Sequence, residues 1–291
     1  MNQNSSNLPF SVAFSALLIG AIAMGISPLF VRIAEVGPFA SAFWRVFLAL
    51  PVLLIWTIWE TRKSKLPYSV AWSFDRPVLL CGIFFAGDLF FWHLAIHHTT
   101  IANATLLSCL APVWVALLSG ALISEKVGKN VFSGLIFCLI GAALLIGSSY
   151  QVDPNRLIGD IYGICTSLFF GLYFLAARVA RRKHGAGAMT FMSATITAPI
   201  LLFIVFVTGQ SLAPQTATGI AALLALGIVS HAGGQGLLAV ALGSLSAAFS
   251  SLVIFIEALA AAFFAWLIFS ESLTPLQSAG GALILLSLIH I

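Results

Sequence analysis

Ten apolar segments, each long enough to cross a lipid bilayer as a helix, follow one another along the chain with short connections between them. A transmembrane helix needs about 20 predominantly apolar residues. The segments, numbered here as spans 1 to 10, comprise residues 12–31, 39–59, 78–96, 102–122, 131–147, 157–177, 189–208, 219–240, 247–269 and 276–289. They are apolar throughout, which excludes the alternating strands of a β-barrel. We therefore predict an all-α integral membrane protein with ten transmembrane helices.

The composition points to the same class of protein. Hydrophobic residues make up 60% of the chain and charged residues 8%, so a soluble domain could not cover its surface with polar groups. The same values exclude a disordered chain and a coiled coil. The net charge of +4 comes from basic residues in the connections between spans, and we expect no nucleic-acid partner. The expected partners are the lipid bilayer and a small-molecule substrate.

The tenth segment is shorter than the others. Its start is predicted at Thr274, which would cap the helix, with Pro275 at the first helical position. Proline is tolerated there because its missing amide proton has no helical partner in the first turn.

Basic residues collect in alternate connections of the chain. Ten Lys and Arg residues follow spans 2, 4 and 6, whereas two follow spans 1 and 5. Short connections rich in Lys and Arg stay in the cytoplasm during membrane insertion. We therefore predict a multi-pass protein of the inner, cytoplasmic membrane with both termini in the cytoplasm.

The two halves of the sequence are related by a constant offset of 146 residues. The offset brings Arg32 onto Arg178 and Ser124-Glu125 onto Ser270-Glu271. It also relates Gly25 to Gly171, Ala86-Gly87 to Ala232-Gly233, Ala95 to Ala241, and Gly134 to Gly280. We predict a first five-helix repeat over residues 1–147 and a second over residues 148–291. Because five is odd, the second repeat enters the membrane from the opposite side, which is typical of secondary transporters that work by alternating access.

Short motifs in the chain resemble those of the drug/metabolite transporter superfamily, in its ten-helix EamA-type branch. They are Ser124-Glu125-Lys126, Ser270-Glu271-Ser272, Ala42-Phe43-Trp44-Arg45, Gly25 with Pro28, and Ala111-Pro112. The chain further resembles YddG-type bacterial exporters of aromatic amino acids. This resemblance implies a central cavity lined largely by spans 1, 3, 4, 6, 8 and 9. The second repeat departs from the pattern, since Glu257-Ala258 stands where a proline matching Pro112 is expected.

Two acidic residues lie near the middle of predicted spans, where charged groups are costly and usually face a cavity or a partner. Asp88 in span 3 shares a helical face with Phe84 and Trp92, so the three could hold a substrate ammonium and an apolar side chain. Glu257 in span 9 could bind the same ammonium. Either acid could also carry a coupling proton. The alternative for both is a structural hydrogen bond to a neighbouring helix.

Five further polar or aromatic side chains are candidate substrate-binding residues. Arg45 in span 2 could pair with a substrate carboxylate or with Asp88, and Trp44 precedes it. His231 and Gln235 lie one turn apart in span 8, beside a glycine cluster that could equally serve helix packing. Tyr162 lies deep in span 6 and could line the cavity.

Span 4 also has a small polar face, with Thr105, Ser108 and Cys109, that could line a cavity or pack against another helix. Glycines and prolines that could act as hinges or packing positions are Gly25, Pro28, Pro112 and Gly171. His93 and His97 have the spacing of a metal pair, but no third ligand is apparent, so we predict no metal site.

The predicted function is export of a small metabolite, and the mostly apolar interior favours an aromatic or other apolar amino acid. A hydrophobic cation or drug is the alternative, because two acids could balance its charge. A membrane enzyme or a channel is a more distant alternative. No catalytic motif and no nucleotide-binding loop is apparent, so we predict neither catalysis nor a cofactor. The oligomeric state is left open between a monomer and a homodimer.

Overall fold

The computed structural model describes residues 8–64, 72–99, 101–147, 156–269 and 274–290, and these residues form helices without any β-strand. The elements are α1 (Phe10–Gly25), α2 (Ser27–Ile33), α3 (Pro38–Phe47), α4 (Leu50–Ser64), α6 (Arg76–His98), α7 (Ile101–Ser108), α8 (Ala111–Ile123), α9 (Lys129–Gly147), α10 (Leu157–Ala180), α11 (Ala186–Thr208), α12 (Ala217–Ala225), η2 (Leu226–Gln235), α13 (Gly236–Leu242), α14 (Ala247–Ser251), α15 (Val253–Phe269) and α16 (Pro275–His290). The all-α prediction is therefore confirmed for this part of the chain.

Nine helical segments among the described residues are long and apolar enough to span a membrane. They are Phe10–Ile33, Pro38–Lys63, Arg76–His98, Ala104–Ile123, Lys129–Ile146, Leu157–Ala180, Ala186–Thr208, Ala217–Leu242 and Ala247–Ile268. Each coincides with one of the first nine predicted spans, with ends that differ by a few residues.

The tenth predicted span forms α16, an apolar helix of 16 residues. Its start agrees with the prediction. The Thr274 hydroxyl accepts a hydrogen bond from the amide of Gln277 at 3.2 Å, and the Gln277 side-chain oxygen accepts one from the amide of Thr274 at 2.9 Å. This reciprocal pair is a capping box, and Pro275 follows it at the first helical position.

Two spans are interrupted next to a proline. α1 ends at Gly25 and α2 restarts with Pro28 in its first turn, whereas α7 ends at Ser108 and α8 restarts with Pro112 in its first turn. Proline lacks an amide proton, so it is accommodated where a helix begins. Both interruptions lie beside the cavity described below, because Pro28 itself and Ser108 line it.

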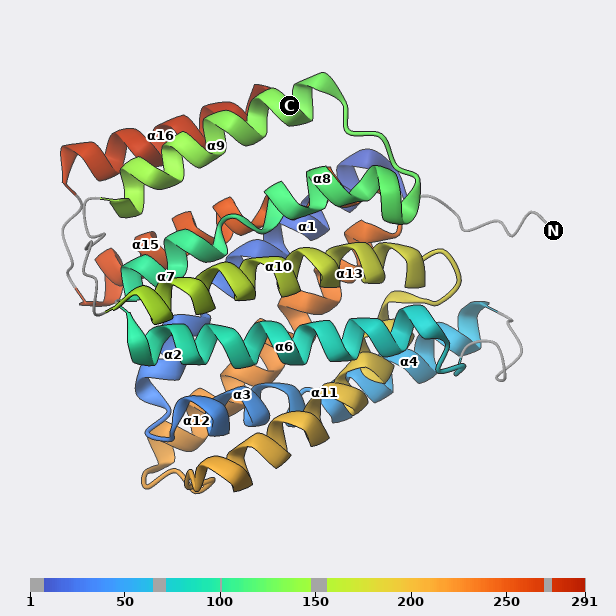
Figure 1. Ribbon diagram of the computed structural model, residues 1–291. Coiled ribbons are helices and arrows are strands. Elements are labelled where there is room, and N and C mark those ends of the chain that lie inside the picture. The colour runs from blue at the N-terminus through green and yellow to red at the C-terminus, as the bar shows by residue number, and fades with distance from the viewer. Residues whose placement is uncertain (1–7, 65–71, 100, 148–155, 270–273, 291) are drawn as a thin grey trace.

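The helices run roughly parallel to one another, with α6 and α10 packed together in the middle and α9 and α16 paired at one edge (Figure 1). The α9–α16 contact is close because glycines face each other. A Cβ atom added to Gly280 would lie 2.6 Å from both the Gly141 carbonyl oxygen and the Leu145 amide nitrogen. Ser287 Oγ also donates a hydrogen bond to the Gly134 carbonyl at 2.8 Å. Backbone packing therefore holds α16 against α9.

We expect Gly280→Ala to lower the melting temperature of the detergent-purified protein, because its Cβ would overlap two backbone atoms of α9 that no side-chain rotation can move. Overpacking of this kind costs about 1–3 kcal/mol. Gly281→Ala is the matched control, since its Cβ would meet only a Leu259 side-chain methyl at 3.1 Å. Equal melting temperatures for the two variants would contradict the proposed role of Gly280.

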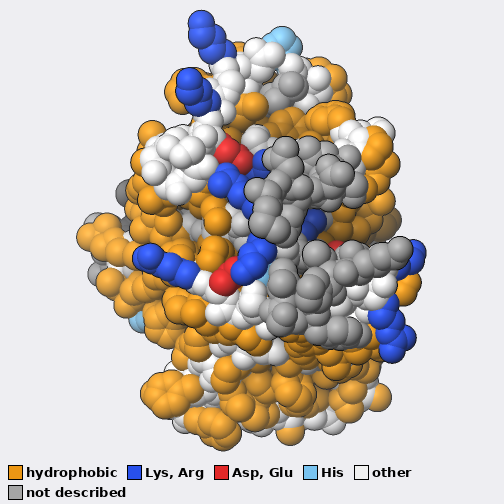
Figure 2. Space-filling model, turned by 90° about the vertical axis from the view of Figure 1, so that its right-hand side faces the viewer, with side chains coloured by type: hydrophobic (Ala, Val, Ile, Leu, Met, Phe, Trp, Pro, Cys, Tyr) orange, Lys and Arg blue, Asp and Glu red, His pale blue; other side chains and the backbone are white. Residues whose placement is uncertain are grey.

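One end of the bundle, called the charged end below, carries most of the charge. Figure 2 shows Lys and Arg side chains gathered on this face with acidic side chains between them. α4, α8 and α10 end here, and α6, α9 and α11 begin here (Figure 1). The basic residues of these termini are Arg62, Lys63, Arg76, Lys126, Lys129, Arg178, Arg181, Arg182 and Lys183. The apolar spans lead away from this end.

Candidate functional site

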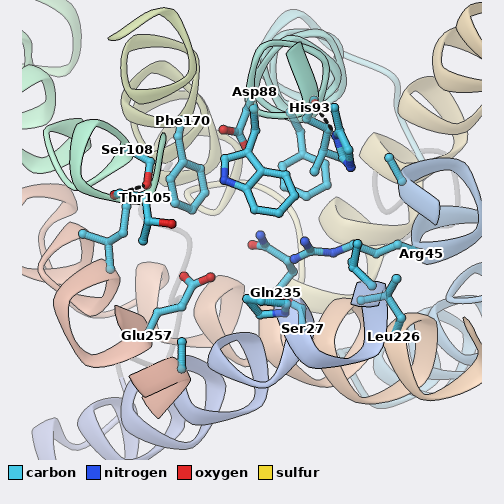
Figure 3. Close-up of a pocket in the computed structure, with 18 of the residues that line it drawn as sticks. Ser27, Arg45, Asp88, His93, Thr105, Ser108, Phe170, Leu226, Gln235 and Glu257 are labelled. Carbon is cyan, nitrogen blue, oxygen red and sulfur yellow. Dashed lines mark hydrogen bonds between the residues drawn. The ribbon is translucent and has the colours of Figure 1, made fainter. Parts of the chain in front are cut away.

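A cavity of about 110 Å³ lies in the interior of the bundle and is lined by residues of seven spans. The lining residues are Ser27, Pro28, Val31, Ser41, Ala42, Arg45, Phe85, Asp88, Leu89, Trp92, His93, Thr105, Ser108, Cys109, Phe170, Leu226, Gln235, Ile254, Glu257, Ala258 and Ala261. They come from spans 1, 3, 4, 6, 8 and 9, as the family resemblance implies, and also from span 2 through α3. Figure 3 shows their side chains converging on one open space.

Asp88 lines the cavity from the middle of α6, and α10 supports its carboxylate from behind. The buried hydroxyl of Thr166 lies 3.0 Å from Asp88 Oδ1 and 2.6 Å from the Asp88 main-chain oxygen. A hydroxyl carries a single proton, so it donates to one of these oxygens at a time. The contact orients the carboxylate, and its second oxygen has no hydrogen-bond partner within the described residues.

Glu257 lies on the opposite wall, on α15, and its carboxylate points into the open space (Figure 3). Within the described part of the chain this carboxylate accepts no hydrogen bond. Its helix is held close to α1, because a Cβ on Gly25 would lie 2.7 Å from the Glu257 carbonyl oxygen. Glu257 is therefore an acid on a well-packed backbone whose side chain is available to a ligand.

Arg45 reaches the cavity from α3, and Gln235 reaches it from the end of η2 (Figure 3). The guanidinium carbon of Arg45 lies 5.9 Å from the centre of the Phe85 ring, within the range of a cation–π contact. Arg45 Nε is buried without a hydrogen-bond partner. The hydroxyl of Tyr173 donates to Gln235 Oε1 at 3.4 Å, which leaves the amide protons of Gln235 for other acceptors.

The three charged groups of the cavity are near one another but not paired. Arg45 interacts electrostatically with both Glu257 and Asp88. Among the described residues, however, no ion pair within 4.0 Å joins Arg45 to either acid. An unpaired cation and two carboxylates on different walls of one cavity can bind a ligand that carries charges of both signs.

Aromatic rings form much of the remaining wall. Phe85, Trp92 and Phe170 all line the cavity. Phe170 stacks on Tyr173 with ring centres 6.1 Å apart, and Phe85 contacts the same tyrosine at 5.2 Å. These rings offer an apolar surface beside the charged groups, which suits an aromatic or aliphatic side chain.

The structure thus brings together five of the nine predicted substrate-binding residues, namely Arg45, Asp88, Trp92, Gln235 and Glu257. Two others lie outside the lining. Phe84 packs edge-on against Phe169 of α10, with ring centres 6.2 Å apart. The Trp44 indole nitrogen donates to the Leu212 carbonyl at 2.7 Å and so joins α3 to the connection after α11.

The remaining two predicted residues also lie outside the lining. The Tyr162 ring contacts Phe91 and His98, with ring centres 6.1 and 5.7 Å away. His231 is buried one layer behind the wall, with its ring 5.3 Å from that of Phe85. No cavity contact supports a substrate-binding role for these two residues in this structure.

Several cavity residues were not among the predicted substrate-binding residues, although two of them belong to the face of span 4 that was open between a cavity wall and a helix contact. Thr105 and Ser108 do line the cavity, so the polar face of span 4 serves this purpose rather than helix packing alone. Ser27 contributes another hydroxyl, and His93 lines the cavity beside Trp92, with Nδ1 2.5 Å from the Leu89 carbonyl oxygen. Their positions in apolar segments carry no signal that distinguishes a cavity wall from a helix contact.

The four predicted hinge or packing residues divide into two kinds. Pro28 and Pro112 mark the two helix interruptions, whereas Gly25 and Gly171 are sites of close packing. A Cβ on Gly171 would lie 2.9 Å from Trp114 Cβ on α8. A Cβ on Gly25 would lie 2.6 Å from that of Ala260 on α15. The hinge role of the prolines stays a prediction.

At the charged end, Glu125 joins the two halves of the chain. Its Oε1 accepts a hydrogen bond from Arg178 Nε at 2.5 Å, and its Oε2 accepts one from the Ala247 amide at 3.0 Å. Arg178 also donates to the Leu242 carbonyl at 2.7 Å. These contacts tie the ends of α8, α10 and α13 to the start of α14. The related Glu271 of the second repeat lies outside the described residues.

A second cluster at the charged end joins α6 to the connection after α10. Asp75 accepts hydrogen bonds from His184 at 2.9 Å and from Lys183 at 3.1 Å. Partial burial raises the pKa of Asp75, but the hydrogen bonds and the electrostatic effects of His184 and Lys183 together lower it by more. Its pKa therefore lies below the ordinary value of 3.8, and the carboxylate stays charged at neutral pH.

The sequence model of the EamA-like transporter family matches residues 11–147 and, a second time, residues 157–291. The chain belongs to the EamA-like transporter family. The predicted membership of the drug/metabolite transporter superfamily is confirmed, and the chain is a multi-pass membrane transporter. The two matches begin at residues 11 and 157, which are 146 apart, as the repeat offset predicts. The closer resemblance to YddG-type exporters stays a prediction.

Relatives of this EamA-family chain are also described as transporters. An uncharacterized transporter of Archaeoglobus fulgidus is 27% identical over 209 residues, which are 69% of this chain and 70% of that protein. An uncharacterized transporter of Helicobacter pylori is 26% identical over 60% of this chain and 58% of that protein. The pseudopaline exporter CntI of Pseudomonas aeruginosa is 28% identical over 54% of each chain. The chain thus spans less than two thirds of the last two relatives.

The fold also occurs in a solved structure. One crystal structure superposes on this EamA-family chain with a TM-score of 0.79 and covers 96% of this chain and 94% of the other, at 19% sequence identity. The agreement extends over nearly the whole of both chains, so the helical arrangement is that of a known fold.

Proposed function

We propose that the protein exports amino acids with aromatic or other apolar side chains across the inner membrane by alternating access. The observation that carries the proposal is the cavity with one unpaired cation, Arg45, and two acids, Asp88 and Glu257, among aromatic rings. The carboxylate of the substrate would lie against Arg45 and the Gln235 amide. Its ammonium group would lie against Glu257 and Asp88. The side chain would contact Trp92 and its aromatic neighbours.

The proposed direction of transport and topology rest on separate observations. The chain would cross the membrane ten times as two inverted repeats, residues 1–147 and 148–291. Both termini would lie in the cytoplasm, because the charged end holds nine basic residues of the described chain. Export is supported by the relative that is named as an exporter of pseudopaline.

A hydrophobic cation is the second candidate substrate. The observation that favours it is the excess of acid in the cavity, where two carboxylates face a single guanidinium. If Arg45 neutralised one acid, the other could balance the charge of an organic cation held among the rings.

The test is uptake of labelled tryptophan and phenylalanine into proteoliposomes, with labelled methyltriphenylphosphonium as the competing substrate and protein-free liposomes as the control. We expect saturable uptake of both amino acids and none of the phosphonium. Uptake of the phosphonium alone would replace the amino-acid proposal by the cation proposal. Uptake of neither would refute both.

We also propose that one of the two acids carries a coupling proton. In that case Asp88→Asn or Glu257→Gln should remove the pH dependence of tryptophan uptake, because the proton-carrying group no longer titrates. The measurement is uptake between pH 5 and 8 for the wild type and both variants. An unchanged profile in both variants would exclude proton coupling through these acids.

A further inference from the structure

Span 8 contains a wide helical turn next to the cavity. η2 is a π-helix of ten residues between α12 and α13, and its last residue, Gln235, lines the cavity. π-helices are rare, occur mostly as short segments within α-helices, and are frequent at functional sites. Their wider turns hold surplus residues, so converting such a segment to α-helix requires a shift in register along the helix.

The related segment of the first repeat has the ordinary α-helical form. Residues 80–89, which the offset of 146 relates to η2, lie inside the continuous helix α6. The offset also holds after this segment, since Ala95 still corresponds to Ala241. The same number of residues thus forms an α-helix in one repeat and a π-helix in the other. Span 8 therefore contains no inserted residue relative to span 3. Ten residues at this position can form either an α-helix or a π-helix.

Polar side chains of η2 are left without partners in the π form. Ser230 and His231 are buried, and the Ser230 hydroxyl and both ring nitrogens of His231 have no hydrogen-bond partner within the described residues. Buried polar groups nearly always have partners, so an unpartnered group calls for an explanation. His231 contacts Phe85, which lines the cavity, so these unpartnered groups lie one layer behind the wall.

Three glycines follow His231, of which Gly234 and Gly236 pack against other helices and Gly233 does not. Gly233, Gly234 and Gly236 have no side chains that must pass neighbouring helices. A Cβ on Gly233 would meet nothing closer than the Ile228 carbonyl oxygen at 3.4 Å, so this residue has no packing partner on another helix. Gly234, by contrast, packs against Met24 of α1.

We propose that η2 is a switch segment that shifts by one residue to an α-helix in the second access state, an inference that rests on the proposed transport function. A one-residue shift turns α13 by about 100° and moves it by about 1.5 Å, so the hydrogen bonds that Arg178 and Arg181 donate to the Leu242 and Ala239 carbonyls in the present state would break. The shift moves Gln235 relative to Arg45 and gives Ser230 and His231 new neighbours. In an inverted repeat the two halves exchange conformations between states, so span 8 would take the form that span 3 has here.

The first test changes the length of the segment. Deleting Gly233 removes one residue and favours the α form, whereas Gly233→Ala keeps the length and serves as the matched control. We expect the deletion to lower tryptophan uptake by proteoliposomes at least tenfold and Gly233→Ala to stay within twofold of the wild type. Uptake by the deletion variant within twofold of Gly233→Ala would overturn the proposal.

A second readout does not depend on the substrate. In a background without the four native cysteines, Gln235→Cys should react with a small water-soluble thiol reagent, because Gln235 lines the cavity. Deletion of Gly233 removes the surplus residue and so holds α13 and Gln235 in their present register, and the labelling rate should stay within about twofold of the undeleted protein. A tenfold lower rate would overturn the switch. Equal labelling rates in proteins of which neither takes up an amino acid would refute the proposed function alone.

If the deletion variant does not accumulate in the membrane, a reversible cross-link tests the proposed switch instead. A Cβ on Gly20 of α1 would lie 3.2 Å from Leu237 Cβ on α13. This separation is a few tenths of an ångström below the range of about 3.5–4.5 Å found in disulfides, so a small shift of the two helices would allow the bond. Oxidation of Gly20→Cys/Leu237→Cys would hold α13 in the present register. We expect uptake to fall at least tenfold on oxidation and to recover on reduction. Uptake that is unaffected by oxidation would contradict the switch.

Discussion

Arg45→Gln is expected to reduce tryptophan uptake by proteoliposomes about 30-fold or more. The guanidinium is the cation of the cavity wall, and removing one partner of a buried charge pair costs about 2–5 kcal/mol. Arg45→Lys should recover only part of the activity, because lysine keeps the charge but loses the planar group that binds a carboxylate with two hydrogen bonds. Arg76→Gln is the control, since Arg76 is exposed at the start of α6.

A substrate without a carboxylate separates binding by Arg45 from a structural role. Tryptamine retains the indole ring and the ammonium group of tryptophan. If Arg45 binds the substrate carboxylate, Arg45→Gln should weaken competition by tryptophan but leave competition by tryptamine within about twofold, since no contact to tryptamine is lost. An equal loss for both compounds, or tryptophan uptake near the wild-type level, would contradict the assignment.

Glu125→Arg is expected to lower the stability of the protein more than Gly280→Ala does. The substitution replaces the acid that binds Arg178 and the Ala247 amide with a second cation. The side chains of Glu125 and Arg178 are 17% and 19% exposed, so the pair is largely shielded from water, and breaking it should cost about 2–4 kcal/mol. The measurement is the melting temperature of the purified protein, together with uptake after reconstitution.

Charge reversal tests whether the effect comes from the ion pair. Glu125→Arg/Arg178→Glu should recover part of the melting temperature, because opposite charges again face each other, although the hydrogen bond to the Leu242 carbonyl is lost. Arg182→Gln is the matched control, since Arg182 lies 3.7 Å from Glu125 and is 49% exposed. A double variant no more stable than Glu125→Arg would refute the pairing.

The class of the fold was predictable because its signal is local. A run of about 20 apolar residues specifies a helix that can cross a membrane, whatever its neighbours. The start of α16 was predictable for the same reason, since Thr274, Pro275 and Gln277 lie within one turn. The repeat was predictable because both copies remain in one chain without a change of spacing.

The candidate site was predictable mainly for its charged members. Asp88, Glu257 and Arg45 could be selected because a charge within a span must face the protein interior or water. Phe84 and Trp92 could not be separated, since both lie on the Asp88 face of α6. Phe84 packs against Phe169, whereas Trp92 lines the cavity.

His231 and Gln235 illustrate a different limit. In an α-helix two residues four positions apart face the same way, which predicts that both line the cavity. η2 is a π-helix, and only Gln235 lines it. A π-helix depends on the packing around a segment, and the same spacing of residues in span 3 gives an α-helix. The form of span 8 therefore has no signature in its own sequence.

The sequence by itself determined the all-helical membrane class, the approximate positions of the nine apolar spans among the described residues, the repeat and the family, because each depends on neighbouring residues or on comparison along the chain. The tertiary structure alone decided which of the charged and aromatic side chains meet in the cavity, and that Glu125 of the first half pairs with Arg178 of the second. Such contacts join residues far apart in sequence. They depend on how each helix is rotated and interrupted against its neighbours, which no local pattern records.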